Sequence, residues 1–286
     1  MKTNAAPSFL LVLWLVLFVA RVSAQAPEPL LTLRAATDDR VTMRLGYESF
    51  HDMELDEVDR FDGWTAAAEL SVPFMERFRL RLAWPFRTEG DAVIKPGQGY
   101  PPDTEIDIEG SGGVYDFATL TFEHQLVFAA DRGFDLGYYL GLGTKADRLD
   151  TTKYNPDDGR NDPFNHTGNL MHLGVRFDRM HGFGEVLGNA GVRYYWNSDD
   201  IYPGGNKDSF LALDLRGAVV FHPWGSVYPA VELAYLGDLS DFNQFTLVPE
   251  LLWPVAEPLH LKLGVVVGLG GTGSQYGGRA ELAVRF

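Results

Sequence analysis

Charged side chains recur at every second position in several segments of this 286-residue chain. Arg79 and Arg81 flank Leu80, and Arg279 and Glu281 repeat the pattern near the end of the sequence. This spacing places the charges on one face of an extended strand and the apolar residues on the other face. Arginines and carboxylates gathered on one face can pair with each other, hold water and select among ions. The chemistry that these residues suggest is therefore electrostatic.

Strands must position these charges, because the dominant period of the sequence from residue 41 onward is two. About twelve segments follow this period, near residues 41–50, 63–74, 78–87, 113–127, 134–146, 167–178, 185–197, 209–221, 226–237, 243–253, 259–270 and 275–286. Each is long enough for a tilted strand that crosses a bilayer, which needs about 9–11 residues. Short connections alternate with longer ones near residues 51–62, 88–112, 147–166, 198–208 and 238–242.

This organisation predicts an all-β fold, a transmembrane antiparallel up-and-down β-barrel of about 12 strands over residues 41–286. Short turns at one end and longer loops at the other are typical of barrels in the outer membrane of bacteria. Ten or fourteen strands are alternatives. A soluble β-sandwich or a lipocalin-like barrel would also alternate, but the apolar faces here are large and aromatic in nearly every strand, and no helix follows to cover them.

The charged face is expected to line the interior of the barrel, because a charge on the lipid side costs about 2–4 kcal/mol near the middle of the bilayer. Eleven basic and ten acidic strand residues lie on this face, so the interior is nearly neutral and the excess negative charge belongs to loops and turns. We expect the pore-lining residues to be Arg44, Glu69, Arg79, Arg81, Glu123, Lys145, Arg176, Arg193, Asp214, Arg216, Glu232, Glu250, Lys262, Arg279 and Glu281.

Such an interior allows two functions. The first is a narrow passive channel for small solutes, in which the lumen arginines, especially Arg79 and Arg81, set the selectivity. The second is a non-conducting structural barrel, or one that interacts with lipopolysaccharide, in which the charges pair across the lumen and fill it. Inward-facing glycines, among them Gly141, Gly174 and Gly191, would leave space and favour the channel.

The apolar face is expected to form the lipid-facing wall, which includes Leu80, Leu82, Leu120, Phe122, Leu136, Leu140, Leu213, Leu215, Leu233, Leu261 and Leu263. Aromatic residues such as Tyr47, Trp84 and Trp253 lie near the strand ends. Amphipathic rings favour the level of the lipid headgroups, so these residues are candidates for aromatic girdles.

The start of the chain reads as a secretory signal peptide over residues 1–24. Lys2 precedes an uncharged apolar stretch at residues 9–20, and the small residues Ser23 and Ala24 offer a cleavage site before Gln25. Export is therefore expected, with the outer membrane as the destination. Residues 25–40 are expected to be a periplasmic segment, either a free tail or a plug that uses Leu31, Leu33 and Arg34.

Composition excludes several other classes of protein. The formal net charge is −15, and it becomes −17 without residues 1–24, which contain two basic residues and no acid. Nucleic acid is therefore not an expected partner, because phosphates need a basic surface. The chain has no cysteine, so disulfides, thiol chemistry and cysteine zinc sites are excluded. The acidic loops are interpreted as solvated surface, and no metal or cofactor is expected.

One glycine-rich segment formally matches a nucleotide-binding motif. Residues 268–273 have the spacing G-x-G-x-x-G, but that fingerprint needs a following helix whose N-terminus meets the pyrophosphate. An alternating strand follows here, so the segment is predicted to be a tight hairpin.

A second motif resembles a catalytic one. The stretch from Asn165 to Asn169 is similar to the H-x-S-N-G neighbourhood of outer-membrane phospholipase A, a family of twelve-stranded barrels. It differs at the nucleophile, because Gly168 stands two residues after His166 where the family has serine. Without that hydroxyl the histidine has nothing to activate. The chain is therefore not expected to be an enzyme, and a barrel enzyme acting on lipid is the less favoured alternative.

Two further resemblances point to bacterial outer-membrane barrels. The alternating final strand that ends in Phe286 resembles the terminal signature of these proteins, which implies recognition by the barrel-assembly machinery and contact with membrane lipid and lipopolysaccharide. Residues 112–117 and 139–143 resemble the transporter-type barrels grouped with phenol meta-cleavage pathways, although Tyr115 replaces the glycine expected before Asp116. That resemblance implies uptake of small, aromatic molecules.

Overall fold

The computed structural model describes residues 26–36, 39–53, 58–95, 105–113, 116–146, 148–151, 167–197, 207–271, 273 and 275–286. Within these ranges the chain forms fourteen strands and one short helix. The elements are β1 (Thr42–Met53), β2 (Val58–Phe74), β3 (Phe78–Ile94), β4 (Glu105–Ser111), β5 (Ala118–Val127), α2 (Ala129–Arg132), β6 (Asp135–Ala146), β7 (Arg148–Thr151), β8 (Thr167–His181), β9 (Gly184–Trp196), β10 (Ser209–Phe221), β11 (Tyr228–Gly237), β12 (Asn243–Ala256), β13 (Leu259–Gly271) and β14 (Tyr276–Arg285).

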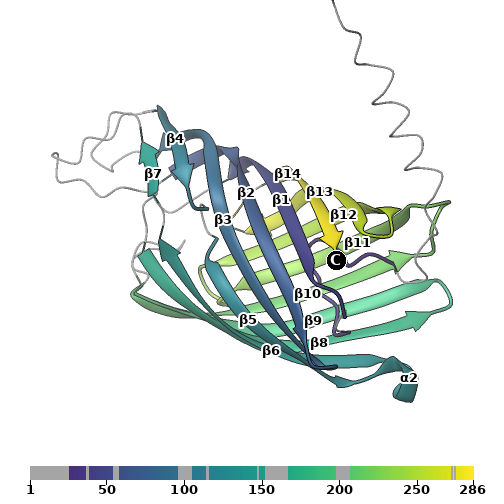
Figure 1. Ribbon diagram of the computed structural model, residues 1–286. Helices are drawn as coiled ribbons and strands as arrows, with labels where there is room; N and C mark the ends of the chain where they lie inside the picture. The colour runs from purple at the N-terminus through teal and green to yellow at the C-terminus, as the bar shows by residue number, and fades with distance from the viewer. Residues whose placement is uncertain are drawn as a thin grey trace, which may run out of the picture.

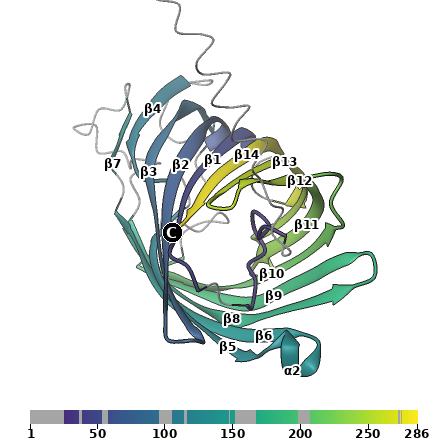
Figure 2. The same cartoon turned by 45° about the vertical axis from the view of Figure 1, so that its right-hand side comes forward.

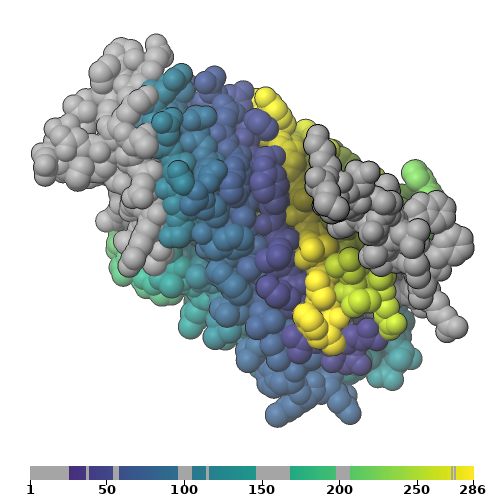
Figure 3. Space-filling view, turned by 45° about the horizontal axis from the view of Figure 1, so that its top comes forward, coloured from purple at the N-terminus to yellow at the C-terminus, as the bar shows by residue number. Residues whose placement is uncertain are grey.

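All strands except β4 and β7 form a closed antiparallel barrel of twelve strands (Figure 1). The barrel closes where β1 pairs with β14 along a continuous register from Thr42 opposite Arg285 to His51 opposite Tyr276. The backbone N–H of Phe286 extends this closure by donating to the carbonyl of Val41 at 2.9 Å. Figure 3 shows the first and last strands, in purple and yellow, side by side on the barrel surface. The predicted fold class and strand number are confirmed.

The alternation of the sequence corresponds to the two faces of the wall. Leu80 and Leu82 are 40% and 43% exposed, whereas Arg79 and Arg81 between and beside them are 4% exposed. Leucines predicted to face lipid in other strands, such as Leu120, are also exposed. This outward apolar surface is what a lipid bilayer requires of a barrel. Among the described residues, no helix is long and apolar enough to cross a membrane.

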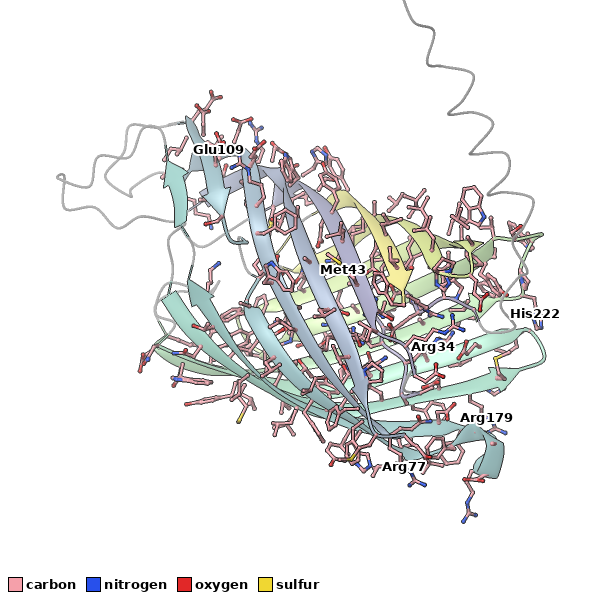
Figure 4. The ribbon with its side chains drawn as sticks, viewed as in Figure 1. Arg34, Met43, Arg77, Glu109, Arg179 and His222 are labelled. Carbon is pink, nitrogen blue, oxygen red and sulfur yellow. The ribbon has the colours of Figure 1, made fainter. Side chains whose placement is uncertain are left out.

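The two ends of the barrel differ. At the end that we call the short-turn end, tight connections join β2 to β3, β8 to β9 and β12 to β13. The opposite long-loop end carries the longer connections, and the two ends are labelled in Figure 4 by Glu109 on one side and by Arg77, Arg179 and His222 on the other. At the end of β13 the glycine-rich segment leads into the antiparallel partner β14, and Gly270, Gly271 and Gly273 have positive φ, which favours glycine.

The long-loop end contains more structure than the sequence pattern predicts. β2 begins at Val58 and β3 continues to Ile94, so both strands extend beyond the barrel, where β4 pairs with β3 and β7 pairs with β4. The expected loops at residues 51–62, 88–112 and 147–166 are therefore partly strand. The extension has its own buried apolar core, formed by Phe50, Met53, Val58, Phe61, Ala92, Ile94, Ile106 and Ile108.

Candidate functional site

A segment that precedes the first strand lies inside the barrel. We call residues 26–36 the lumen segment, and Figure 2 shows it as the dark purple trace within the ring of strands. Ala26 packs against a buried cluster at the short-turn end that includes Leu187 and Tyr228. The segment then rises to Leu30 and Leu31, which border the cavity described below, and returns toward the rim. Residues 26–36 of the expected periplasmic segment thus lie inside the barrel.

Side chains of the wall hold the tip of the lumen segment by its backbone. Glu232 of β11 is fully buried and accepts the backbone N–H groups of Leu31 at 2.7 Å and Thr32 at 2.5 Å. Glu250 of β12 accepts the N–H of Leu30 at 3.1 Å. The carboxyl oxygens of these two side chains thus satisfy three consecutive backbone N–H groups that have no strand partner.

Cationic side chains of the wall bind the carbonyl groups of the same tip. The Arg216 Nη1 donates to the carbonyl of Leu31 at 2.7 Å, and Lys262 Nζ donates to the carbonyl of Pro29 at 3.3 Å. The extended backbone of the tip is therefore satisfied by side chains of β10 and β13 rather than by pairing with a strand. A buried backbone without such partners would be costly.

The returning half of the lumen segment is fixed by three wall residues. Asn189 of β9 accepts the N–H of Leu33 at 2.8 Å and donates to its carbonyl at 2.7 Å. Arg34 forms a bidentate pair with Glu185, in which Nη2 lies 2.5 Å from Oε2, and both side chains are 7% exposed. Asp178 accepts the N–H of the next residue, Ala35, at 2.6 Å. Figure 4 shows Arg34 within the barrel.

Glu28 joins the lumen segment to a buried cluster of ions on the opposite wall. Its Oε2 lies 2.5 Å from Arg44 Nη2, and its Oε1 accepts the backbone N–H of Arg34 at 2.7 Å. Burial opposes ionisation of this carboxyl, but Arg44 and Arg81 hold the pKa of Glu28 well below its usual range. The carboxylate therefore stays charged inside the barrel because arginines surround it.

The same cluster contains several of the residues predicted to line a pore. Arg81 lies 3.0 Å from both Glu69 and Glu123, and Arg176 lies 2.7 Å from Glu123, which also pairs with Arg79. Arg79, Arg81 and Arg176 are 4–5% exposed. These charges pair across strands β2, β3, β5 and β8, and Arg81 also faces Glu28 of the lumen segment at 3.8 Å.

The inward-facing glycines also make room for side chains rather than for solvent. A Cβ on Gly174 or Gly191 would meet the hydroxyl of Tyr139 at 2.6 Å or 2.3 Å, and one on Gly141 would overlap His172. His172 in turn forms a hydrogen bond of 3.0 Å with the hydroxyl of Thr121. The space that the glycines were expected to leave is therefore occupied.

A cavity of about 450 Å³ lies between this packed region and the long-loop end. Leu30 and Leu31 of the lumen segment border it. The remaining lining residues are Glu48, Phe50, Met53, Ala67, Glu69, Asp116, Arg193, Tyr195, Phe210, Asp214, Arg216, Ala234, Tyr235, Leu236, Phe242, Gln244, Thr246, Val266, Gly273 and Arg279. The volume is in the range of small-molecule sites.

One wall of the cavity carries an arginine pair that shares a single carboxylate. Asp214 accepts from Arg193 at 2.8 Å and 2.6 Å, and from Arg216 at 2.8 Å and 2.9 Å. Both arginines are 22% exposed, which is well above the arginines of the buried cluster. Arg279 lies 2.5 Å from Glu48 and is also partly exposed. These are the arginines that a molecule in the cavity would meet.

The fifteen residues expected to line a pore are thus divided among different surroundings. Five border the cavity: Glu69, Arg193, Asp214, Arg216 and Arg279. Glu232, Glu250 and Lys262 bind the lumen segment, and Lys262 also pairs with Glu281 at 2.6 Å. Arg44, Arg79, Arg81, Glu123 and Arg176 belong to the buried cluster, and Lys145 donates to the carbonyl of Gly113.

Sequence reasoning missed three groups of residues. Glu185 and Asn189 share the alternation of Arg193 in β9, so the period of two could have identified them. Glu28 lies outside any strand and gives no periodic signal. The apolar lining at the long-loop end was assigned to no site, because apolar residues on an inward face do not differ in type from those of the outer wall.

His166 lies outside the described residues. Within the described ranges, no group of three or more histidine, aspartate or glutamate side chains is arranged to hold a metal ion.

Comparison with known proteins defines the class of fold. No protein-family model matches the chain, and no curated protein matches its sequence. An outer membrane channel from Pseudomonas putida F1 aligns with a TM-score of 0.61 and 13% identity, over 92% of this chain and 100% of that one. The transport unit of the autotransporter AIDA-I from Escherichia coli aligns with a TM-score of 0.54 and 10% identity, over 100% and 99% of the two chains.

The β-domain of the Bordetella autotransporter Brka is a third similar structure, with a TM-score of 0.51 and 12% identity over 87% of this chain and 100% of that chain. The fold is that of the bacterial outer-membrane β-barrels. At these identities the similarity concerns the fold, so the function must be argued from the interior.

Proposed function

We propose that the protein is an outer-membrane channel for small solutes whose short-turn end is closed by its own lumen segment. The observation that carries the proposal is the cavity of about 450 Å³, which is bordered by Leu30 and Leu31 of that segment. A solute that enters from the long-loop end would reach these two residues. Conduction then requires the segment to move.

The way in which the segment is held supports such a movement. The contacts of its tip and returning half with the wall are hydrogen bonds and ion pairs from wall side chains, such as Glu232, Asn189 and Glu185, to the segment. The strand ladders of the barrel do not include residues 26–36. The segment can therefore leave without any loss of the backbone pairing that stabilises the barrel.

Planar-bilayer recording of the purified protein tests the proposal. We would compare the chain that starts at Gln25 with a variant that lacks residues 25–36. The variant is expected to show larger and more frequent conductance steps, because its short-turn end is open. Folding of both would be checked by their electrophoretic mobility with and without heating. If the shortened barrel is folded and conducts no better than the intact one, the proposal is wrong.

A disulfide that can be formed and reduced provides the matched control. The chain has no cysteine, so Leu33→Cys with Asn189→Cys introduces one pair at a point where the wall touches both backbone groups of the segment. The oxidised protein is expected to remain closed and the reduced protein to conduct. Each single cysteine variant shows what the substitution itself does.

The second candidate is a non-conducting structural or lipopolysaccharide-interacting barrel, and the buried ion cluster favours it. Glu123 is shared by Arg79, Arg81 and Arg176, and such a buried network of ion pairs is what a structural role would require. Under this alternative, Arg79→Ala and Arg81→Ala would lower stability and leave ion selectivity unchanged. In a channel, a change in selectivity is expected first at Arg193 and Arg216, which are more exposed.

We further propose that export by residues 1–24 brings the protein to the outer membrane. The signal peptide lies outside the described residues. The final strand β14 and Phe286 would be recognised by the barrel-assembly machinery, and the exposed apolar wall would contact lipid and lipopolysaccharide. Fractionation of cell envelopes, with Phe286→Ala as the variant, tests this placement through the yield of folded barrel.

A further inference from the structure

The lining of the cavity separates into an apolar part and a charged part. Tyr195 and Phe210 stack with ring centroids 4.4 Å apart, and with Phe242 they belong to one buried cluster near the long-loop end. Phe50 and Met53 border the same space from β1. This part presents ring faces and methyl groups, and it offers a surface for an aromatic ring or a short alkyl chain.

The charged part lies deeper, on β9 and β10. Arg193 and Arg216 share Asp214, so these three residues carry one net positive charge. The charges across the lumen differ from this: Glu48 is matched by Arg279, Glu69 is matched by Arg44 and Arg81, and Asp116 adds an acid. An anion is therefore attracted to the arginine pair, whereas the charges of the opposite wall cancel and offer it no net attraction.

The two parts lie close together because they alternate along the same strands. Tyr195 is two residues from Arg193 in β9, and Phe210 is four residues from Asp214 in β10. Residues two apart on a strand share a face and are about 7 Å apart. A ligand with an anionic group and an apolar body of a few carbon atoms would span both parts.

We propose that this cavity binds an amphipathic monoanion, a carboxylate attached to an aromatic ring or a short alkyl chain. The carboxylate binds the guanidinium groups of Arg193 and Arg216, and the apolar body packs on Tyr195, Phe210 and Phe242. Guanidinium groups bind carboxylates in a planar, bidentate geometry, and Asp214 already fixes the orientation of both arginines. The inference deepens the proposed channel function by naming its solute class, and it rests on that function for its physiological meaning.

The site also adjoins the lumen segment. Arg216 donates to the carbonyl of Leu31 through Nη1 while it contacts Asp214 through Nε and Nη2. A carboxylate bound to Arg216 would therefore lie next to the residue that closes the cavity. The anion would meet the closed end of the channel at the point where the segment is tied to the wall.

Calorimetric titration of the full barrel in lipid nanodiscs tests the site. The probe is 3-phenylpropionate, compared with its neutral amide, with the cation 3-phenylpropylamine and with acetate, which has no apolar body. Each titration is corrected with empty nanodiscs. We expect 3-phenylpropionate to bind about tenfold or more tightly than the amide, because hydrogen bonds to charged groups contribute about that factor. Acetate and the amine should bind more weakly still.

Variants test the roles of the charged part and the apolar part of the cavity. Arg193→Gln and Phe210→Ala are each expected to weaken 3-phenylpropionate about tenfold, whereas Arg193→Lys should keep part of the affinity because it keeps the charge. Arg87→Gln is the control, since Arg87 pairs with Glu89 and Glu109 outside the cavity. Electrophoretic mobility before and after heating shows that each variant is folded.

Several results would overturn the proposal: no measurable binding of 3-phenylpropionate, equal affinity for its amide, or equal effects of Arg193→Gln and Arg87→Gln. Conductance is recorded separately and without the probe. A barrel that conducts after removal of residues 25–36 but binds no carboxylate contradicts this inference alone. A barrel that binds the carboxylate but never conducts contradicts the proposed channel function, and the proposed binding site still stands.

Discussion

Glu232, in the middle of β11, accepts the backbone N–H of Thr32 at 2.5 Å, two hundred residues earlier in the chain. The carboxylate is fully buried, and its second oxygen accepts the preceding N–H of Leu31 at 2.7 Å. One side chain of the wall thus satisfies two consecutive backbone groups at the tip of the lumen segment.

The first prediction concerns this contact. Glu232→Gln removes the charge and leaves one amide oxygen for two N–H donors, so the segment should detach more often. Ala35→Cys serves as the reporter, because Ala35 is 5% exposed in the docked segment and the chain has no other cysteine. We expect the rate of labelling by a water-soluble maleimide to rise about tenfold, since hydrogen bonds to charged groups contribute about 1.5–3 kcal/mol.

Glu109→Gln is the matched control for that experiment. It makes the same change of carboxylate to amide in β4, where the side chain is 64% exposed at the long-loop end (Figure 4). Its labelling rate should equal that of the reporter alone. Equal rates for the two amide variants would show that Glu232 does not hold the segment.

The second prediction concerns the buried pair of Arg34 and Glu185. Arg34→Gln alone leaves an unpaired carboxylate inside the barrel, and Glu185→Gln alone leaves an unpaired guanidinium. Breaking a buried pair in this way costs about 3–5 kcal/mol, whereas removing both charges costs much less. With the Ala35→Cys reporter, each single variant should label much faster, and the double variant should return toward the starting rate.

The same four proteins also show whether an effect arises in the lumen segment or in the barrel. The strand ladders do not involve Arg34, so the heat-dependent electrophoretic mobility of the barrel should be the same in all four proteins. Additive effects of the two substitutions would mean that the charges act independently, which the short contact between them does not allow.

The barrel was predictable because the residues of its wall alternate between the lipid-facing side and the interior. Leu80 and Arg79 lie on opposite faces, and the same alternation from β1 to β14 sets the strand number and the face toward lipid. The extension at the long-loop end follows the same rule, since buried Ile106 and Ile108 alternate with Glu105 and Asp107 in β4. That strand was overlooked because seven residues are too few to cross a bilayer.

The site was predictable only in part. Periodicity identified the charges that face inward, but it does not tell which of them face each other across the barrel. Arg193 borders a cavity and Arg81 lies in a buried cluster, although both have the same pattern of neighbours in the sequence. The difference arises from where the lumen segment lies, and an extended segment held by its backbone leaves no pattern in the sequence.

The third prediction is a dependence of docking on pH through Glu28. The arginines around it hold its pKa well below the usual range in the docked state, against the effect of burial. The released segment therefore binds a proton more readily than the docked one. The contribution of Glu28 to docking should be constant from neutral pH down to the ordinary carboxyl pKa of about 4.3, and it should weaken as the pH falls further.

A spin label at position 31, attached through Leu31→Cys, measures this dependence. The label should gain mobility below pH 4.5 or so, at the ordinary carboxyl pKa. In the Glu28→Gln background the segment should be more mobile at neutral pH and should change less on acidification. Identical titration curves with and without Glu28 would assign the effect to the other carboxylates that face the segment, such as Glu232.

The fourth prediction tests the packing that replaces open space in the lumen. A Cβ on Gly174 would lie 2.5 Å from the carbonyl oxygen of Ala190 and 2.6 Å from the hydroxyl of Tyr139, so Gly174→Ala must displace backbone. Gly188→Ala on the adjacent strand meets only one backbone oxygen, at 4.0 Å. Overpacking costs about 1–3 kcal/mol, so Gly174→Ala should lower the free energy of unfolding by that amount while Gly188→Ala leaves it nearly unchanged. Guanidinium unfolding in phospholipid vesicles measures both, and an equal loss in the two variants would mean that this part of the lumen is loosely packed enough to hold a pore.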